Sequence, residues 1–78
     1  MTPIVADGFD AAIIGLAGDT VVYDADKMHG ILEAQGMTNL EAMEYFNFNI
    51  AGAYVGENTP IYVTPMTRNE IDEIVDAD

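Results

Sequence analysis

Residues 36–56, GMTNLEAMEYFNFNIAGAYVG, decide most of the fold that this 78-residue chain can be expected to adopt. Thr38 and Glu41 have the spacing of a capping box, in which each side chain accepts a hydrogen bond from the backbone N–H of the other residue at a helix start. The glycine that closes the stretch is a suitable residue to end a helix. The stretch therefore predicts a long helix over residues 39–55.

This expected helix has one clearly apolar side and an unusual aromatic residue on the other. Six apolar residues share one arc of about 120° at helical spacing: Ala42, Met43, Phe46, Ile50, Ala53 and Tyr54. Asn49 lies at one edge of this arc, and Asn47 lies just outside the other edge. Phe48 falls on the opposite side, among Glu41 and Glu44. The helix is therefore either buried on both sides, or it presents Phe48 at a contact surface.

The two amides and a glycine of this helix carry separate expectations. An amide left unpaired at the border of a core costs about 1–3 kcal/mol, so we expect Asn49 to hydrogen-bond backbone groups around the sheet. On this interpretation Asn49→Ala destabilises the fold more than Asn47→Ala. The alternative is that Asn49 binds a ligand or the backbone of a partner. Gly52 costs ~1 kcal/mol against alanine inside a helix, which predicts close approach of another helix or strand.

The segment before residue 20 predicts a short helix followed by a strand. Asp7 can cap the helix, with Asp10 in the acidic position of the box. Three apolar residues form one stripe at helical spacing: Phe9, Ile13 and Leu16. Gly18 is a suitable stop for this helix. The β-branched and aromatic run TVVY at 20–23 then predicts a strand.

The remaining segments predict two more helices and a second strand. Asp24 can cap a helix over residues 25–35. The apolar residues expected inside that helix are Met28, Ile31 and Leu32. The run PIYVT at 60–64 predicts the second strand. Thr67 and Glu70 form another capping box, which starts a last helix. Its apolar residues, expected to face the core, are Ile71, Ile74 and Val75.

The order of these elements, α-β-α-α-β-α, predicts the fold class. Two helices joined by a short link run back and then forward, so the second strand should return antiparallel to the first. We therefore expect a small single α+β domain over residues 1–78, with a two-stranded antiparallel sheet packed on helices. Residues 1–6 and 65–78 are expected at its periphery.

The charge of the chain is strongly acidic. Fourteen Asp and Glu residues stand against Lys27 and Arg68, which gives a formal net charge of −12. Such a surface repels phosphate backbones and anionic membranes, so we expect no direct nucleic acid and no membrane among its partners. It attracts basic protein surfaces and divalent cations. The acidity therefore serves either recognition or only solubility.

The composition predicts a folded protein of the cytoplasm. Half of the residues are hydrophobic and 9% are aromatic, which is too rich for a disordered chain. No apolar run approaches the ~20 residues of a membrane-spanning helix, and the N-terminus lacks the basic region of a signal peptide. A domain this small and apolar can hide surface by association, so we expect a homodimer or a higher oligomer at micromolar concentration, with Phe48 or Tyr54 near the contact.

Three segments together resemble a known family. They are GFDAAIIG, VVYDADK and GMTNLEAMEYFNFNIAGAYVGENTPIYV, within residues 8–63. The chain is similar to small uncharacterised phage and viral proteins that pair a Y-D-x-D-K segment with G-M-T-x-x-E-A-x-E-Y-F-x-F-N-x-x-G-A-x-V-G-E-x-T-P. Family members often carry tyrosine at position 25 and cysteine at position 28, where this chain has Ala25 and Met28. The resemblance implies a phage origin and the cytoplasm of a host cell, and it implies no activity.

The residues that usually carry catalysis are scarce. Serine and cysteine are absent and His29 is the only histidine, which excludes the usual Ser–His and Cys–His arrangements. Asp24 and Asp26 at a strand end are of the type that holds Mg²⁺, but a cap and a first-turn acid explain both residues. We therefore expect no enzyme, no catalytic residue, no cofactor and no metal site.

Two hypotheses about function follow, beside a third in which the chain is a purely structural part of a virion or assembly. The first is a small acidic interaction protein, phage-encoded, that binds a basic surface of a host or phage protein as an inhibitor or as a mimic of nucleic-acid phosphates. Its partner-binding residues would be Glu41, Glu44, Phe48 and Tyr54. The alternative is a domain that binds a small ligand or a metal ion. Its ligand-binding residues would be Asp24, Asp26, Asn49 and Glu57.

Overall fold

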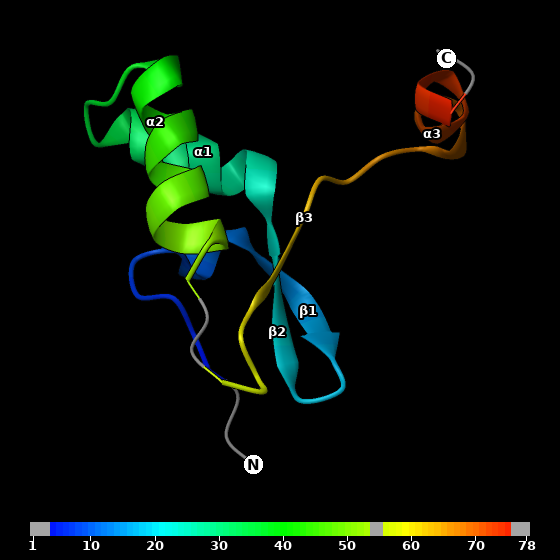
Figure 1. Cartoon of the computed structure of the whole chain (residues 1–78), viewed down its shortest axis with the longest axis horizontal. Helices are drawn as coiled ribbons and strands as arrows, with labels where there is room; N and C mark the ends of the chain where they lie inside the picture. Colours follow the sequence, from blue (N-terminus) through cyan, green and yellow to red (C-terminus); the bar gives the residue numbers. More distant parts are fainter. Residues whose placement is uncertain (1–3, 54–55, 76–78) are drawn as a thin grey trace.

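Strand β2 (Thr20–Asp24) is the centre of a three-stranded sheet in the computed structural model, which describes residues 4–53 and 56–75 (Figure 1). Strand β1 (Ile13–Ala17) pairs with it antiparallel, and strand β3 (Ile61–Val63) pairs with it parallel on the other side. The α+β class is confirmed. The expected two-stranded antiparallel sheet is wrong in both the number and the direction of its strands.

The extra strand comes from the segment that was expected to be the first helix. A 3₁₀ turn, η1 (Asp10–Ala12), leads directly into β1, and Ala17 pairs with Thr20 across a two-residue loop. Gly18 in this loop has a φ of 63°, whereas no described residue other than glycine has a positive φ. Only the first loop residue is left-handed, as in a type II′ hairpin turn. Gly18 therefore reverses a strand and does not end a helix.

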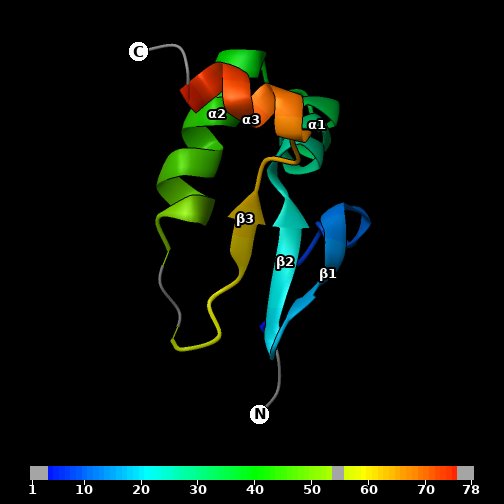
Figure 2. The same cartoon turned by 90° about the vertical axis from the view of Figure 1, so that its right-hand side faces the viewer.

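The direction of β3 follows from the path of the chain between the strands. Helix α1 (Ala25–Ala34) leaves the end of β2, and helix α2 (Asn39–Tyr45) continues into the π-helix η2 (Phe46–Ala51). Figure 2 shows α2 and η2 descending beside the sheet, and it shows the chain from residue 56 approaching β3 from the end where β2 begins. The chain therefore enters β3 in the same direction as β2. The antiparallel expectation was wrong because α1 does not itself run back along the sheet.

The starts of α1 and α2 agree with their sequence signals, whereas the cap expected at Asp7 is wrong, because η1 begins after Phe9 and has no side-chain cap. The Lys27 N–H donates to the Asp24 carboxylate at 3.1 Å, which confirms the cap of α1. At the start of α2 the Thr38 N–H donates to Glu41 at 2.8 Å, and the Glu41 N–H donates to the Thr38 hydroxyl at 3.1 Å. The capping box is therefore confirmed. In the part of the chain that the structure describes, no helix is long and apolar enough to cross a membrane.

The core lies between one face of the sheet and the helices α1, α2 and η2. Its largest fully buried side chains are Tyr23, Met28 and Leu32. Tyr62 of β3 stacks on Tyr23 with ring centroids 5.7 Å apart and meets the edge of Phe46 at 5.4 Å. These ring contacts connect β2, β3 and η2, so the core depends on the parallel strand being in place.

The helix η2 ends earlier than expected and for a different reason. The helical conformation stops at Gly52, whereas residues 54 and 55 lie outside the described part of the chain. A Cβ built at Gly52 would lie 3.1 Å from the carbonyl oxygen of Asn47, in the preceding turn. No other helix or strand approaches this glycine within 4 Å among the described residues. Gly52 therefore accommodates the wide turn of the π-helix itself.

The last helix, α3 (Arg68–Val75), begins as expected but packs differently. Thr67 and Glu70 exchange the two hydrogen bonds of a capping box at 3.1 and 3.2 Å. The expected burial is wrong, because α3 contains no buried residue in the described range. Its apolar residues are 45–67% exposed: Ile71, Ile74 and Val75. Helical periodicity shows which side of a helix is apolar, but it does not show whether the chain supplies a surface to cover it.

Candidate functional site

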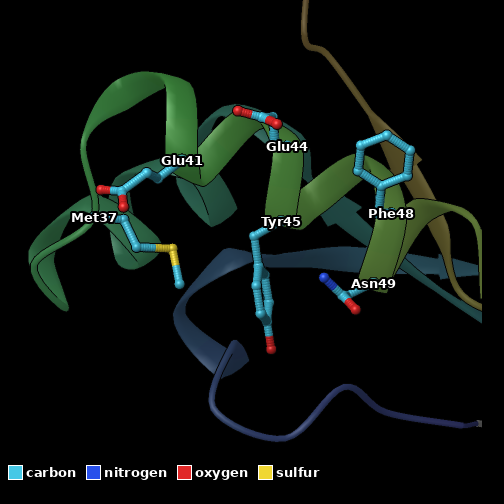
Figure 3. Close-up of a pocket in the computed structure, with 6 residues that line it drawn as sticks. All are labelled: Met37, Glu41, Glu44, Tyr45, Phe48 and Asn49. Carbon is cyan, nitrogen blue, oxygen red and sulfur yellow. The ribbon is translucent and has the colours of Figure 1, made fainter.

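The outward side of α2 and η2 carries an open depression of about 370 Å³. Figure 3 shows the six residues that line it: Met37, Glu41, Glu44, Tyr45, Phe48 and Asn49. Three of the four partner-binding residues expected from the sequence are in this set, together with one residue from the alternative ligand set. The fourth, Tyr54, lies outside the described residues.

The helix arranges these side chains in two rows. Residues four apart on a helix are neighbours on its surface, so Glu41, Tyr45 and Asn49 form one row, and Glu44 and Phe48 form the other. In Figure 3 Tyr45 and Asn49 point to one side of the helix, while Glu44 and Phe48 point to the other. Each of the two rows therefore contributes one carboxylate and one aromatic ring to the depression. A group bound in the depression would therefore contact both negative charge and a flat apolar surface.

Phe48 is the most unusual member of the site. Its side chain is 79% exposed, the largest fraction of any large apolar side chain among the described residues. Phe46, two residues earlier, is buried and contacts His29 and Tyr62. The helix is therefore buried on one side only, and Phe48 is left on the solvent side. Of the two possibilities that the sequence left open, burial of the helix on both sides is therefore wrong, and Phe48 lies at the surface.

The two carboxylates of the depression are held differently. Two groups of Thr38 hold the pKa of Glu41 below its usual value of 4.5. The backbone N–H has the larger effect and the hydroxyl has the smaller one. Hydrogen bonds to the ionised form of an acid favour that form. The Glu44 side chain makes no hydrogen bond and no ion pair with the other described residues. Glu41 is thus a fixed negative charge, and Glu44 is free to pair with a cation.

The lowered pKa of Glu41 predicts a pH-dependent contribution to stability. A carboxyl with a depressed folded-state pKa stabilises the fold above its unfolded value, and this stabilisation is lost as pH falls through the folded value. We expect Glu41→Gln to lower the free energy of unfolding at pH 7, and we expect this difference to shrink as pH falls below 4.5. Urea unfolding of both proteins from pH 7 to pH 3 measures it. A difference that is equally large at pH 3 would contradict the assignment.

The residues of the alternative ligand set lie in separate places. Asp24 is buried and uses its carboxylate to cap α1, while Asp26 and Glu57 are exposed on α1 and on the connection before β3. Among residues 4–53 and 56–75 no group of three or more histidine, aspartate or glutamate side chains could hold a metal ion. Of this set, only Asn49 lines the depression.

The expectation for Asn49 is wrong. Its side chain is exposed and makes no hydrogen bond to the other described residues, so it does not tie the helix to the sheet. Asn47 is exposed as well. The π-turns of η2 change the phase that a regular 100° wheel assumes, which moves Asn49 away from the core border. Asn49→Ala and Asn47→Ala should therefore have similar, small effects on stability.

Two residues of the site were missed by the sequence interpretation. Tyr45 lies four residues after Glu41 on the same helical row, whereas Met37 precedes the cap residue Thr38 and reaches the depression from the chain before α2. The signal was present in the spacing, but Tyr45 reads equally well as a core residue. Helical spacing from Glu41 predicts the position of Tyr45, but it does not apply to Met37, which precedes the helix.

Comparisons with known proteins identify no relative of this chain. No family model matches the chain, and searches of the curated proteins and of the solved structures return no match. The charge, exposure and geometry of the depression on α2 and η2 are therefore the features that point to a function.

Proposed function

We propose that the chain is a small acidic interaction domain that binds a basic surface of another protein in the depression on α2 and η2. The observation that supports this proposal most is the exposed Phe48 beside the carboxylate of Glu44, which has no partner among the described residues, in one depression. An apolar ring in the centre supplies contact area that is desolvated on binding, and the acids around it select a cationic partner.

The chemistry of the depression favours arginine as the anchoring residue of the partner. A guanidinium group is planar, stacks on aromatic rings and pairs with carboxylates through several N–H groups. Tyr45 and Phe48 supply the rings, and Glu41 and Glu44 supply the carboxylates. Met37 at the end of the depression can contact the aliphatic part of the same side chain.

The net charge of −12 extends this preference beyond the depression. A field of one sign accelerates the encounter with a partner of the opposite sign, and the effect falls as salt shortens the Debye length to about 10 Å at 0.1 M. The partners with the strongest basic surfaces are proteins that bind nucleic acid, and such a protein would be inhibited by occlusion. The resemblance to phage proteins supports a host or phage protein as the partner.

Reversing one charge tests the proposal. We expect Glu44→Lys to slow association with an arginine-rich amphipathic helical peptide by several-fold at low salt, because a cation then meets a cation at the depression. Surface plasmon resonance against the immobilised peptide measures the rate. Glu44 is a better choice than Glu41, whose side chain also caps α2.

Glu33→Lys is the matched control, since Glu33 is exposed on α1 and does not line the depression. It makes the same change in net charge, so it should reduce the association rate less than Glu44→Lys. Equal effects of the two variants would show that only the net charge matters. Association that is unchanged in molar salt would also count against the proposal.

A further inference from the structure

The sheet has a second face that the described helices leave bare. Val21 and Tyr23 of β2 point into the core, so Val22 between them points to the opposite face. The parallel register places Ile61 beside Val22, and Val63 follows on the same face. Figure 2 shows this face turned to the viewer, with no helix in front of most of its length. One side of the sheet therefore lacks a second layer.

The residues on the bare face are apolar, unlike those of a sheet face that is exposed to water. Sheets with one solvated face alternate apolar and polar residues, whereas strands covered on both faces read as continuous apolar runs. The central runs are VVY in β2 and IYV in β3, without a polar residue. Apart from Asp24, which caps α1, β2 and β3 carry no charged residue in a chain with fourteen acids. The composition predicts that another element covers this face.

Helix α3, in turn, has an apolar side that no other described element covers. Its apolar stripe of Ile71, Ile74 and Val75 is exposed, and Met66 just before it is exposed too. Figures 1 and 2 place α3 on the bare side of the sheet but beyond the end of β3, so it does not cover its own strands. Pro65 favours an extended residue before it, which continues the direction of the strand away from the sheet. The chain thus carries an uncovered sheet face and a helix with nothing to cover.

We propose that α3 of a second copy of this chain covers the bare sheet face, in a reciprocal exchange between two copies. The same two surfaces are present on each copy, so a two-fold axis satisfies both at once and closes the assembly. The described apolar residues of one α3 can bury roughly 300 Å², and two such helices on two sheets bury about 1,200 Å² in total. This reaches the range of stable dimers, while a single contact gives about half of it.

Charge and position are compatible with this exchange. The acids of α3 that follow the stripe, Asp72 and Glu73, lie off its apolar side, and Asp72 is paired with Arg68 at 2.9 Å. Like charges on the two copies are therefore outside the apolar contact, where salt screens them over about 8–10 Å. Helix α2 and the π-helix η2, whose residues line the depression, lie on the other side of the sheet (Figure 1). The contact differs from the one expected at Phe48 or Tyr54, and it leaves the proposed partner site free.

Sedimentation equilibrium over a range of concentrations tests the exchange. We expect twice the monomer mass at micromolar concentration for the unaltered chain, and a dimer weakened at least about tenfold by Ile71→Asp or by Ile61→Asp. Glu73→Gln on α3 and Phe48→Ala on η2 are the controls and should leave the dimer unchanged. A monomer at all concentrations, or a dimer lost in Phe48→Ala and kept in Ile71→Asp, would overturn the proposal.

A crosslinking experiment does not depend on how well these variants fold. The chain has no cysteine, so Ile61→Cys in one copy and Ile71→Cys in another can be mixed and oxidised. We expect a disulfide-linked dimer from this pair and much less from Phe48→Cys mixed with Ile71→Cys. A single chain that carries both Ile61→Cys and Ile71→Cys would form an internal disulfide if α3 folded back on its own sheet. An internal crosslink in place of the dimer would overturn the exchange.

Discussion

Leu32→Ala is expected to lower the free energy of unfolding by about 2–5 kcal/mol, the largest effect of a single substitution considered for this fold. Leu32 is 1% exposed and lies with Tyr23 and Met28 at the centre of the only core cluster found in the described residues. A chain of 78 residues has a total stability of about 4–12 kcal/mol, so the loss takes a large part of it. Urea unfolding followed by circular dichroism measures the change.

The control for this prediction is the same substitution on the surface. Leu40 of α2 is 62% exposed, so Leu40→Ala removes the same atoms with little change in burial and should cost less than about 0.5 kcal/mol. Thermal unfolding should show the contrast as well, since 1 kcal/mol corresponds to about 4–8 °C in a domain of this size. Equal effects of the two substitutions would mean that the core is not where the structure places it.

Phe48→Ala is expected to weaken binding to the arginine-rich peptide by roughly thirtyfold or more, which is the loss of about 2 kcal/mol typical of a central aromatic contact. The fold should be unaffected, because the side chain is largely exposed in the free chain and buries little surface there. Isothermal titration calorimetry at low salt measures the affinity. A variant that unfolds more easily but binds equally well would reverse the roles assigned to this residue.

Leu16→Ala provides a second exposed apolar position for comparison. Leu16 belongs to β1 and does not line the depression, so its truncation should leave the affinity unchanged. Glu44→Lys should mainly lower the association rate, whereas Phe48→Ala should mainly raise the dissociation rate. The two substitutions therefore separate steering by charge from contact by the ring. A nonspecific attraction to the acidic surface would show the first effect without the second.

The local signals of the sequence predicted three of the four expected helix starts correctly, and only the cap at Asp7 failed. Asp24, the Thr38–Glu41 box and the Thr67–Glu70 box depend only on residues three apart, and all three are found in the structure. The strand TVVY was also correct to within one residue. These features are determined by short stretches of chain, so no knowledge of the tertiary fold is needed to find them.

The errors arose where a local pattern allowed two structures. Phe9, Ile13 and Leu16 match a helical stripe, yet the β-branched Ile13 and Ile14 before a Gly-Asp pair are equally typical of a hairpin. The direction of β3 depends on how far each helix travels along the sheet, which no local pattern contains. The exposure of α3 depends on what lies beside it. These properties are set by tertiary packing, not by residue spacing.

The candidate site shows the same division. The helical spacing of Glu41, Glu44 and Phe48 placed them together before the structure was known, and they line one depression. The position of Asn49 was wrong because a regular wheel does not include the wide turns of η2. The grouping of residues on a helix could thus be predicted, while its phase near the π-helix could not.

The parallel pairing of β3 with β2 has a consequence for the order in which the fold forms. The β1–β2 hairpin closes over a two-residue loop and can form within about 1–10 μs. Val22 meets Ile61 only after a much longer loop, which includes both main helices, has been closed. Until then the second edge of β2 carries free backbone N–H and C=O groups that another chain can pair with. During refolding, the slow pairing of β3 with β2 therefore competes with faster pairing of the β2 edge to another chain. Dilution slows only the second process and so favours the native fold.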